Sequence, residues 1–265
     1  MKVGFIGTGN MGGALAKAAA KVVPGENIYL YDRCQEKAQQ LADSLHCQCT
    51  DLHGISQCTY IFLGVKPQVM AQMMEGLSGF LKNRQDEFVL VSMAAGVPMA
   101  RIQELAGEKY PVIRIMPNMP VSVGAGMIQY DVTENVTEAM EKGFVKCMEC
   151  AGVLDKIPEP LINAGTSVAS CGPAFAFLFM ESLTQGGVAC GLTEEKAMLY
   201  AKQMLLGSAK LALESDMTPA QLREAVCSPG GSTIEGVKVF EKEGLRDITE
   251  KAVLASYYRN IELGK

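Results

Sequence analysis

The sequence predicts an α/β fold in which a doubly wound parallel sheet comes first and an all-helical part follows. From residue 3 to about residue 157, short apolar runs alternate with amphipathic helical stretches, the pattern of a parallel sheet covered by helices. After Pro158 only helical periods remain. We therefore expect two domains, residues 1–157 and 158–265.

The composition is that of a globular protein. Hydrophobic residues make up 48% of the 265 positions and charged residues 20%, and the net charge of -5 disfavours nucleic-acid and anionic membrane partners. Because the first strand is expected to begin at residue 2, we expect no signal peptide and a cytoplasmic protein. The most apolar stretch, Pro173–Leu183, is shorter than the ~20 residues of a membrane span, and we expect it to be a buried helix.

The nine cysteines are expected to be free thiols in a reducing compartment. Neither Cys47-x-Cys49 nor Cys147-x-x-Cys150 has a second matching pair. The only histidines flank the first pair, but their spacing fits no standard zinc template. We therefore expect no metal site.

A glycine motif follows the first strand, Val3–Ile6, and opens the alanine-rich helical stretch Ala14–Val22. In this context G-x-G-x-x-G is typical of dinucleotide binding and of a Rossmann-like domain. Gly7 permits the tight turn, Gly9 lets the backbone approach a pyrophosphate, and Gly12 allows close packing of helix on strand. The alternative is a plain glycine turn. The candidate cofactor-binding residues here are Gly7, Thr8, Gly9, Asn10, Met11 and Gly12.

The second strand, Asn27–Tyr31, ends in Asp32 and Arg33. Asp32 lies about twenty positions after Gly12, where an acidic side chain would bind the ribose 2′-OH of NAD. Arg33 could instead bind the 2′-phosphate of NADP. The two residues favour different nucleotides, and a helix cap followed by a solvated charge is the alternative for both.

Alternating elements continue through the first domain. The stretches expected to form helices or strands here are residues 34–45, 47–49, 51–57, 60–65 and 67–81. The run Tyr60–Val65 is a continuous apolar strand that stops at Lys66-Pro67. Since open α/β sheets bind ligands at the carboxyl ends of their strands, Val65, Lys66 and Pro67 are candidate cofactor contacts.

Two more strand ends carry candidate residues. The strand Phe88–Ser92 runs into a small-residue turn that suits the approach of a flat ring; its members are Met93, Ala94, Ala95 and Gly96. A helix from Pro98 and the strand Val112–Met116 follow, and the latter leads into a proline-stiffened loop with Asn118. The expected elements that complete this domain are a strand at residues 125–131, a helix at 133–150 and a strand at 153–154.

The second domain is expected to consist of helices at residues 161–190, 193–215, 219–227, 233–243 and 245–263. Small residues along the first of them allow another helix to approach closely, and Phe175, Phe177 and Phe179 are expected to lie mostly in the core. So apolar and slender a domain is expected to associate with a second copy of the chain.

A loop between two of these helices has the composition of an anion site. Its residues are Ser228, Pro229, Gly230, Gly231, Ser232 and Thr233. The backbone N–H groups that open the next helix, with the hydroxyl groups, would suit the carboxylate of a small substrate. The alternative is a capping loop with Thr233 as the N-cap.

Taken together, these motifs resemble the pyrroline-5-carboxylate reductase family. The resemblance covers nearly the whole chain in order, and the stretch Leu222–Gly236 is its most specific part. Other matching segments are the glycine motif, Val65-Lys66-Pro67, Ala94-Ala95-Gly96, Arg114-x-Met116-Pro117-Asn118 and Gly172-Pro173-Ala174. This chain departs from the family pattern at Met119, at Ser170-Cys171 and at Asp32.

The resemblance implies hydride transfer from NADPH or NADH to the C=N bond of 1-pyrroline-5-carboxylate, which gives L-proline, the last step of proline biosynthesis. It favours NADPH, while NADH stays open. It implies a helical dimerisation domain, and a substrate carboxylate held by the Ser228–Thr233 loop in a site that a partner subunit often completes. Thr233 would bond the ring nitrogen as the catalytic candidate, with Asn118 and Asp216 near the substrate.

The sequence has two alternative functions to set against this one. A β-hydroxyacid dehydrogenase would carry a lysine on the first long helix of its second domain, and the stretch Leu161–Leu192 has none. The other alternative is a non-enzymatic dinucleotide-binding or redox-sensing protein, in which the Ser228–Thr233 loop would have no function.

Overall fold

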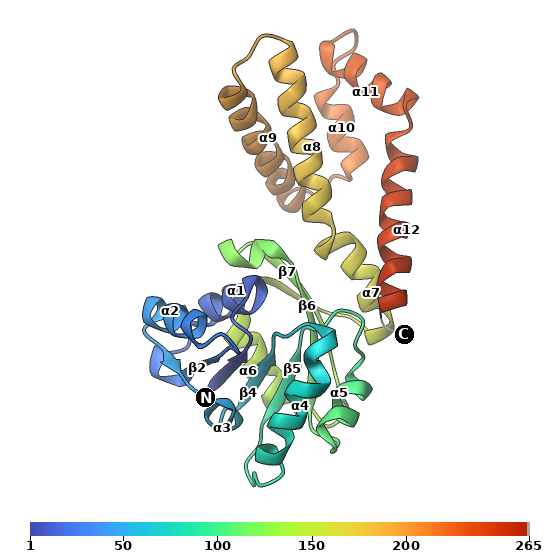
Figure 1. The fold of residues 1–265 in the computed structure, drawn as a ribbon. Helices are drawn as coiled ribbons and strands as arrows, with labels where there is room; N and C mark the ends of the chain where they lie inside the picture. The colour runs from blue at the N-terminus through green and yellow to red at the C-terminus, as the bar shows by residue number, and fades with distance from the viewer. Residues whose placement is uncertain (264–265) are drawn as a thin grey trace. The chain divides into compact units, whose positions relative to one another are not determined.

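The computed structural model describes residues 1–263, and its strands form one eight-stranded sheet. Figure 1 shows the fold. Its strand order is β3-β2-β1-β4-β5-β6-β7-β8. The strands are β1 Val3–Ile6, β2 Ile28–Tyr31, β3 Gln48–Cys49, β4 Tyr60–Leu63, β5 Val89–Ser92, β6 Val112–Pro117, β7 Gly126–Val132 and β8 Gly152–Lys156.

Six helices alternate with the strands, and six more follow the last strand, up to the end of the described chain. The first group is α1 Asn10–Ala19, α2 Gln35–Leu45, α3 Leu52–Ser56, α4 Pro67–Leu81, α5 Met99–Ala106 and α6 Glu138–Met148. The second group is α7 Ile162–Gly165, α8 Gly172–Ala189, α9 Glu194–Glu214, α10 Pro219–Val226, α11 Ser232–Lys242 and α12 Leu245–Leu263. A π-helical turn, Thr166–Ser170, joins α7 to α8.

The doubly wound α/β architecture is confirmed, with one difference in strand direction. Strands β1 to β6 are parallel, but β7 runs antiparallel to β6, and β8 is parallel to β7. The predicted helix at residues 133–150 is shorter in the structure, because Thr137 caps α6 by accepting a hydrogen bond from the N–H group of Met140.

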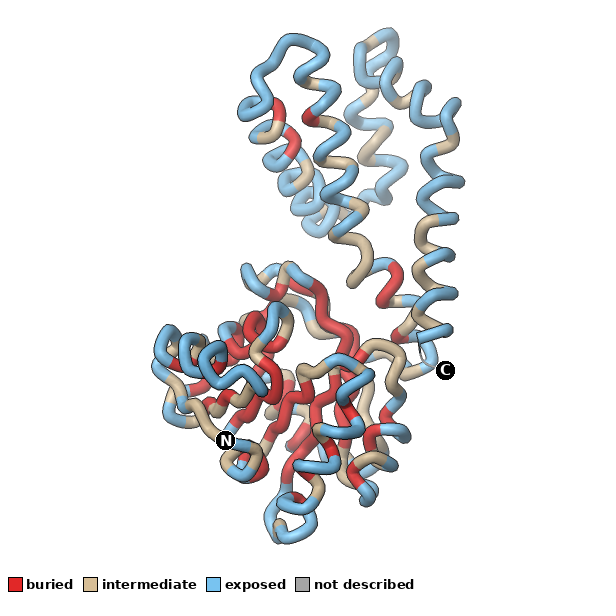
Figure 2. The backbone as a smooth tube through the Cα atoms, in the orientation of Figure 1, coloured by how far each residue is buried: buried red, intermediate tan, exposed pale blue. Residues whose placement is uncertain are grey.

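Two apolar cores lie on the two faces of the sheet, since neighbouring residues of a strand point in opposite directions. Phe5 and Phe62 stack on one face with ring centroids 4.5 Å apart, beneath α1, α2 and α6. Ile6, Ile61 and Leu63 face the other side, beneath α3, α4 and α5. Figure 2 shows this part of the chain as the region rich in buried residues.

The chain forms two compact units. One contains Met1–Cys171 and the residues from Ser256 on, and the other contains Gly172–Ala255. The change from mixed strands and helices to helices alone follows β8, which ends at Lys156. The segment that links β8 to Gly172 is therefore helical but packs with the sheet.

The second unit is thin, and its apolar side chains are largely uncovered. The expectation that Pro173–Leu183 is a buried helix is wrong for the single chain: Phe177 is 55% exposed and Leu178 63% exposed. Phe175 and Phe179 are half-buried rather than core residues. The prediction of a helix here is confirmed, but the helices of this unit do not cover all faces of α8. Figure 2 shows few buried residues in this part of the chain.

Among the described residues, one helical stretch is long and apolar enough to cross a membrane. It is the continuous helical stretch Glu159–Ala189, with 31 residues and a mean hydropathy of 1.3. Only its length and composition suggest a membrane span. This stretch is longer than Pro173–Leu183 because it includes the turns that precede α8. One such helix is weak evidence for a membrane protein.

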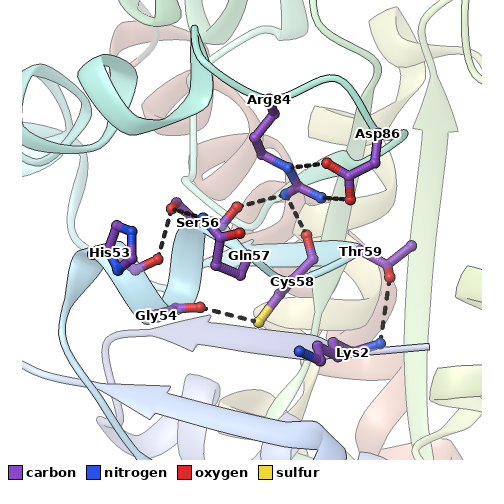
Figure 3. Close-up of polar contacts among 9 residues, drawn as sticks. All are labelled: Lys2, His53, Gly54, Ser56, Gln57, Cys58, Thr59, Arg84 and Asp86. Carbon is purple, nitrogen blue, oxygen red and sulfur yellow. Dashed lines mark hydrogen bonds and ion pairs between the residues drawn. The ribbon is translucent and has the colours of Figure 1, made fainter.

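A buried arginine braces the amino-terminal edge of the sheet (Figure 3). Arg84 Nη1 donates to the carbonyl oxygens of Ser56 and Cys58, each at 2.6 Å. Its Nε and Nη2 donate to the two carboxylate oxygens of Asp86 at 2.9 and 2.6 Å, and its guanidinium lies over the ring of Phe88. All of its charge is thus compensated locally, as a buried cation requires.

We expect Phe62→Ala to destabilise the sheet unit by about 3–5 kcal/mol, because it removes a fully buried ring from between Phe5 and Phe144. Chemical denaturation measures this change. Phe80→Ala is the control, since Phe80 is 40% exposed and should cost less than about 1 kcal/mol. Equal losses in the two variants would contradict the assigned core.

Candidate functional site

The carboxyl ends of five neighbouring parallel strands meet at one edge of the sheet. The order β2-β1-β4-β5-β6 places the turns after these strands side by side, and the strand order reverses direction between β1 and β4. Such a switch point is where open α/β sheets bind ligands. The first-domain candidates at this edge are residues 7–12, 32–33, 65–67, 93–96 and 118.

The glycine turn after β1 is a close approach of three backbone segments. Gly7 has φ +92°, and a Cβ on it would lie 2.5 Å from the carbonyl oxygen of Gly64. A Cβ on Gly12 would collide with the carbonyl oxygen of Gly7. Only glycine fits at either position, which agrees with the roles expected for the first and third glycines of the motif. Gly64 was not predicted, although a glycine directly after β4 was a visible signal.

Gly9 is different, because the space beside it is open. A Cβ there would meet nothing within 4 Å, and Gly9 is the N-cap of α1. No side chain caps this helix, and its first turn holds no acidic residue. The free N–H groups and the positive end of the helix dipole therefore fit a pyrophosphate that approaches the backbone closely.

Asp32 is tied to the glycine turn. One carboxylate oxygen accepts the N–H of Thr8 at 2.7 Å and its hydroxyl at 3.1 Å, and the other accepts the N–H of Cys34 at 3.0 Å. Partial burial alone would raise the pKa of Asp32, but these hydrogen bonds and the charge of Lys37 outweigh burial and hold that pKa below its usual value. Asp32 is therefore ionised at neutral pH.

Arg33 and the turn after β4 are open to solvent. Arg33 is exposed and forms no ion pair with another described residue. Pro67 is the first residue of α4, as expected, and Lys66 is its exposed N-cap. Both turns thus place a cation at the edge that carries the glycine motif, where it can approach a phosphate.

The turn after β5 is compact and partly buried. Ala94 is 2% exposed, Gly96 has φ +76°, and the N–H of Val97 donates to the carbonyl oxygen of Ala94 at 3.2 Å. Ala94, Ala95 and Gly96 have no side chain large enough to react, so they can only shape a surface. This agrees with a place where backbone approaches a flat ring.

Asn118 uses its amide to hold protein segments together. Its Oδ1 accepts the N–H of Met127 at 2.9 Å, and its Nδ2 donates to the carbonyl oxygen of Ala169 at 2.9 Å. The residue is 8% exposed. Its side chain therefore fixes the end of β6 against β7 and the π-helical turn, and one amide hydrogen remains for another partner.

The second predicted site lies in the helical unit. Gly230 has φ +71°, and the N–H of Gly231 donates to the carbonyl oxygen of Ser228 at 3.0 Å. Gly231 is the N-cap of α11, and no side chain caps that helix. The alternative in which Thr233 is the N-cap is therefore wrong, since Thr233 is the second helical residue. The exposed N–H groups of this loop, with hydroxyls of Ser228, Ser232 and Thr233, form a surface that suits an anion.

Asp216 lies in the exposed turn between α9 and α10. The structure thus gathers the predicted dinucleotide residues at one sheet edge in one unit, and the loop residues and Asp216 are in the other unit. Among the described residues no group of three metal-ligating side chains occurs, and the nine cysteines are free.

Fold and site together define a dinucleotide-binding protein, because a glycine-lined helix start sits at the switch point of a doubly wound sheet. Comparison with known proteins agrees. Residues 2–96 match the family described as NADP oxidoreductase, coenzyme F420-dependent, and residues 159–263 match pyrroline-5-carboxylate reductase dimerisation.

Relatives identify the family over the full length. The pyrroline-5-carboxylate reductase of Escherichia coli is 33% identical over 269 residues, covering 100% of this chain and 98% of the relative. A solved pyrroline-5-carboxylate reductase from Coxiella burnetii is 31% identical with a TM-score of 0.91, and the NADP-bound Plasmodium falciparum pyrroline carboxylate reductase is 27% identical with a TM-score of 0.89; both cover 100% of this chain and 98% of the other. The chain belongs to the pyrroline-5-carboxylate reductase family.

We expect Gly9→Ala to lower the stability by no more than about 1 kcal/mol, since alanine is a poorer N-cap than glycine. It should weaken dinucleotide binding by about tenfold or more, since its Cβ points into open space that a pyrophosphate would use. Fluorescence titration measures the affinity. Gly79→Ala, also in open space but on α4, is the control; it should leave the affinity unchanged and raise the stability slightly, because alanine favours a helix more than glycine does. Unaltered binding by Gly9→Ala would contradict the site.

Proposed function

We propose that this chain reduces the C=N bond of 1-pyrroline-5-carboxylate to L-proline, the last step of proline biosynthesis, with a reduced nicotinamide dinucleotide. The observation that carries this proposal is the uncapped Ser228–Thr233 loop, an anion-binding surface in a member of this family. A carboxylate suits that surface. Functionally, we divide the chain near residue 157, two positions before the dimerisation match begins.

The residues at the sheet edge suit the cofactor. When bound, the reduced nicotinamide supplies the hydride. We assign its pyrophosphate to the Gly7–Gly12 turn, where Gly9 leaves room and α1 offers free N–H groups. The nicotinamide half is assigned to Val65–Pro67 and Met93–Gly96, where every side chain except that of Lys66 is small or apolar and permits close contact with a flat ring.

The loop in the helical unit is assigned to the substrate. Ser228, Gly230 and Ser232 would bind its carboxylate through backbone N–H groups and hydroxyls, and the Thr233 hydroxyl would bond the ring nitrogen. Gly231, whose N–H bonds the carbonyl oxygen of Ser228, would hold the shape of this substrate loop. Such an imine is electrophilic once protonated, so orientation accounts for most of the catalysis and no histidine or lysine acid is required. Asp216 is assigned to the substrate's vicinity, and Asn118 to shaping the site by fixing the end of β6.

For the nucleotide we propose NADPH over NADH. Thr8 and Cys34 already donate three hydrogen bonds to Asp32, which leaves this carboxylate little capacity for a ribose 2′-OH. Arg33 is exposed without an ion pair and could form bidentate bonds to a 2′-phosphate.

We further propose that the helical unit binds a second copy of the chain in the cytoplasm, as a dimer or larger homo-oligomer. An apolar groove of about 950 Å³ lies among α8, α11 and α12, and its lining includes Phe175, Leu178, Phe179, Phe240, Leu245 and Ile248. A second copy would cover this groove and the exposed face of α8, which also accounts for the apolar stretch without a membrane.

The proposed activity predicts that NADPH is oxidised when pyrroline-5-carboxylate is added, with a lower kcat/KM for NADH. Absorbance at the reduced nicotinamide band measures both. Turnover with neither nucleotide would refute the enzyme reading and favour a non-enzymatic dinucleotide-binding protein. A higher kcat/KM for NADH would refute only the nucleotide preference.

We expect Thr233→Ala to lower kcat/KM by tens- to a few hundred-fold, as for one positioning hydrogen bond worth about 2–3 kcal/mol. Thr233→Ser keeps the hydroxyl and should recover most of the activity. Thr193→Ala removes another exposed threonine hydroxyl of this unit, the N-cap of α9, and is the control. Steady-state kinetics of Thr233→Ala that match the wild type would exclude this role.

Self-association predicts a mass at least twice that of one chain by light scattering at micromolar concentration. Leu178→Asp places a charge in the apolar groove and should shift the mass toward the monomer. Val153→Asp on β8 is the matched control, because Val153 and Leu178 are both 63% exposed. A monomeric wild type would refute the proposed partner.

A further inference from the structure

The turn between β5 and α5 begins at Met93 and ends where α5 starts, at Met99. Both of its ends are linked to Arg114 on the neighbouring strand β6, one by strand pairing and the other through a carboxylate. Ser92, the last residue of β5, pairs in register with Arg114. The other end of the turn reaches Arg114 through the carboxylate of Glu159.

Arg114 depends on Glu159 for charge compensation. It is 4% exposed, and its Nη1 lies 3.0 Å from Oε1 of Glu159. Nε and Nη2 are buried and have no hydrogen-bond partner among the described residues. Since a buried cation is costly unless paired, the position of the Glu159 carboxylate is strongly constrained.

Glu159 passes this constraint to α5. The same Oε1 accepts the N–H of Met99, the first residue of α5, at 2.8 Å. The backbone of Glu159 is itself fixed, because its N–H donates to a carboxylate oxygen of Asp131 at 2.6 Å and prolines flank it on both sides. Pro98, the N-cap of α5, offers no capping side chain, so the Glu159 carboxylate takes that place.

We propose that Arg114 and Glu159 are positioning residues for the nicotinamide half of the dinucleotide. Neither belongs to the turn. They fix its α5 end through the bond from Met99 to Glu159. Strand pairing with β6 fixes its β5 end, and the N–H of Val97 bonds the carbonyl oxygen of Ala94 within it. This inference rests on the proposed function, because it needs the Met93–Gly96 turn to contact the nicotinamide.

The test compares two ligands. NADPH has a nicotinamide, and 2′-phospho-ADP-ribose is the same nucleotide without it. In Glu159→Ala and in Arg114→Met the N–H of Met99 loses its fixed acceptor. We expect the Kd for NADPH to rise about tenfold in each, the effect of one lost charge-assisted hydrogen bond. The Kd for 2′-phospho-ADP-ribose should stay within about twofold of the wild type, since the glycine turn is untouched.

Two further variants separate positioning from general loss of stability. Glu159→Gln keeps an oxygen that can accept the bond from Met99, and should retain most of the NADPH affinity. Arg84→Met removes another buried guanidinium, whose side chain is 4% exposed against 5% for Arg114. Because Arg84 lies at the amino-terminal edge, this control should lower the melting temperature and change neither Kd (Figure 3).

The outcomes are distinct. NADPH affinity that is unchanged in Glu159→Ala and Arg114→Met overturns the inference, and so does an equal loss of affinity for both ligands. A Glu159→Gln variant as weak as Glu159→Ala also contradicts it, because the acceptor would then be irrelevant. If the wild type binds neither NADPH nor NADH, the proposed function itself fails. That result comes from the wild type alone and is distinct from any result on the variants.

Discussion

The approach of three backbone segments at Gly7, Gly12 and Gly64 is the constraint on which the carboxyl edge of the sheet depends. It brings the start of α1 directly against the end of β1, and the end of β1 against the residue that follows β4. A single Cβ at Gly7 or Gly12 would force these segments apart. This contact positions the neighbouring parts of the site. They are the open side of Gly9, the bond from Thr8 to Asp32 and the turn after β4.

Most of the sheet could be predicted because burial on both faces leaves a plain sequence signal. Runs such as Tyr60–Leu63 are apolar throughout, and the residues that follow them must lie at one edge if the strands are parallel. The reversal of β7 was missed, although it had a signal. Only residues 118–125 connect β6 to β7, and a crossover to a parallel strand needs about a dozen residues or more.

The helical unit shows what periodicity alone does not reveal. The apolar spacing of α8 predicted a helix correctly, but it does not distinguish a face packed inside one chain from a face meant for another. Phe177 and Leu178 look like core residues in the sequence and are more than half exposed in the chain. Asn118 stays a predicted substrate residue, and its amide also bonds Met127 of β7 and Ala169 of the π-helical turn, which the sequence does not reveal.

Glu159 had no local signal at all. In the sequence it sits between two prolines at the point where strands cease, and it looked like part of a boundary. In the structure its carboxylate joins Arg114 to the start of α5, and those two partners are 45 and 60 positions away. Only the packing of the linking segment on the sheet brings them together. The turn between β5 and α5 is therefore held by Glu159, a residue that follows the last strand. The segment that leads from β8 to the helices thus helps to shape the edge of the sheet.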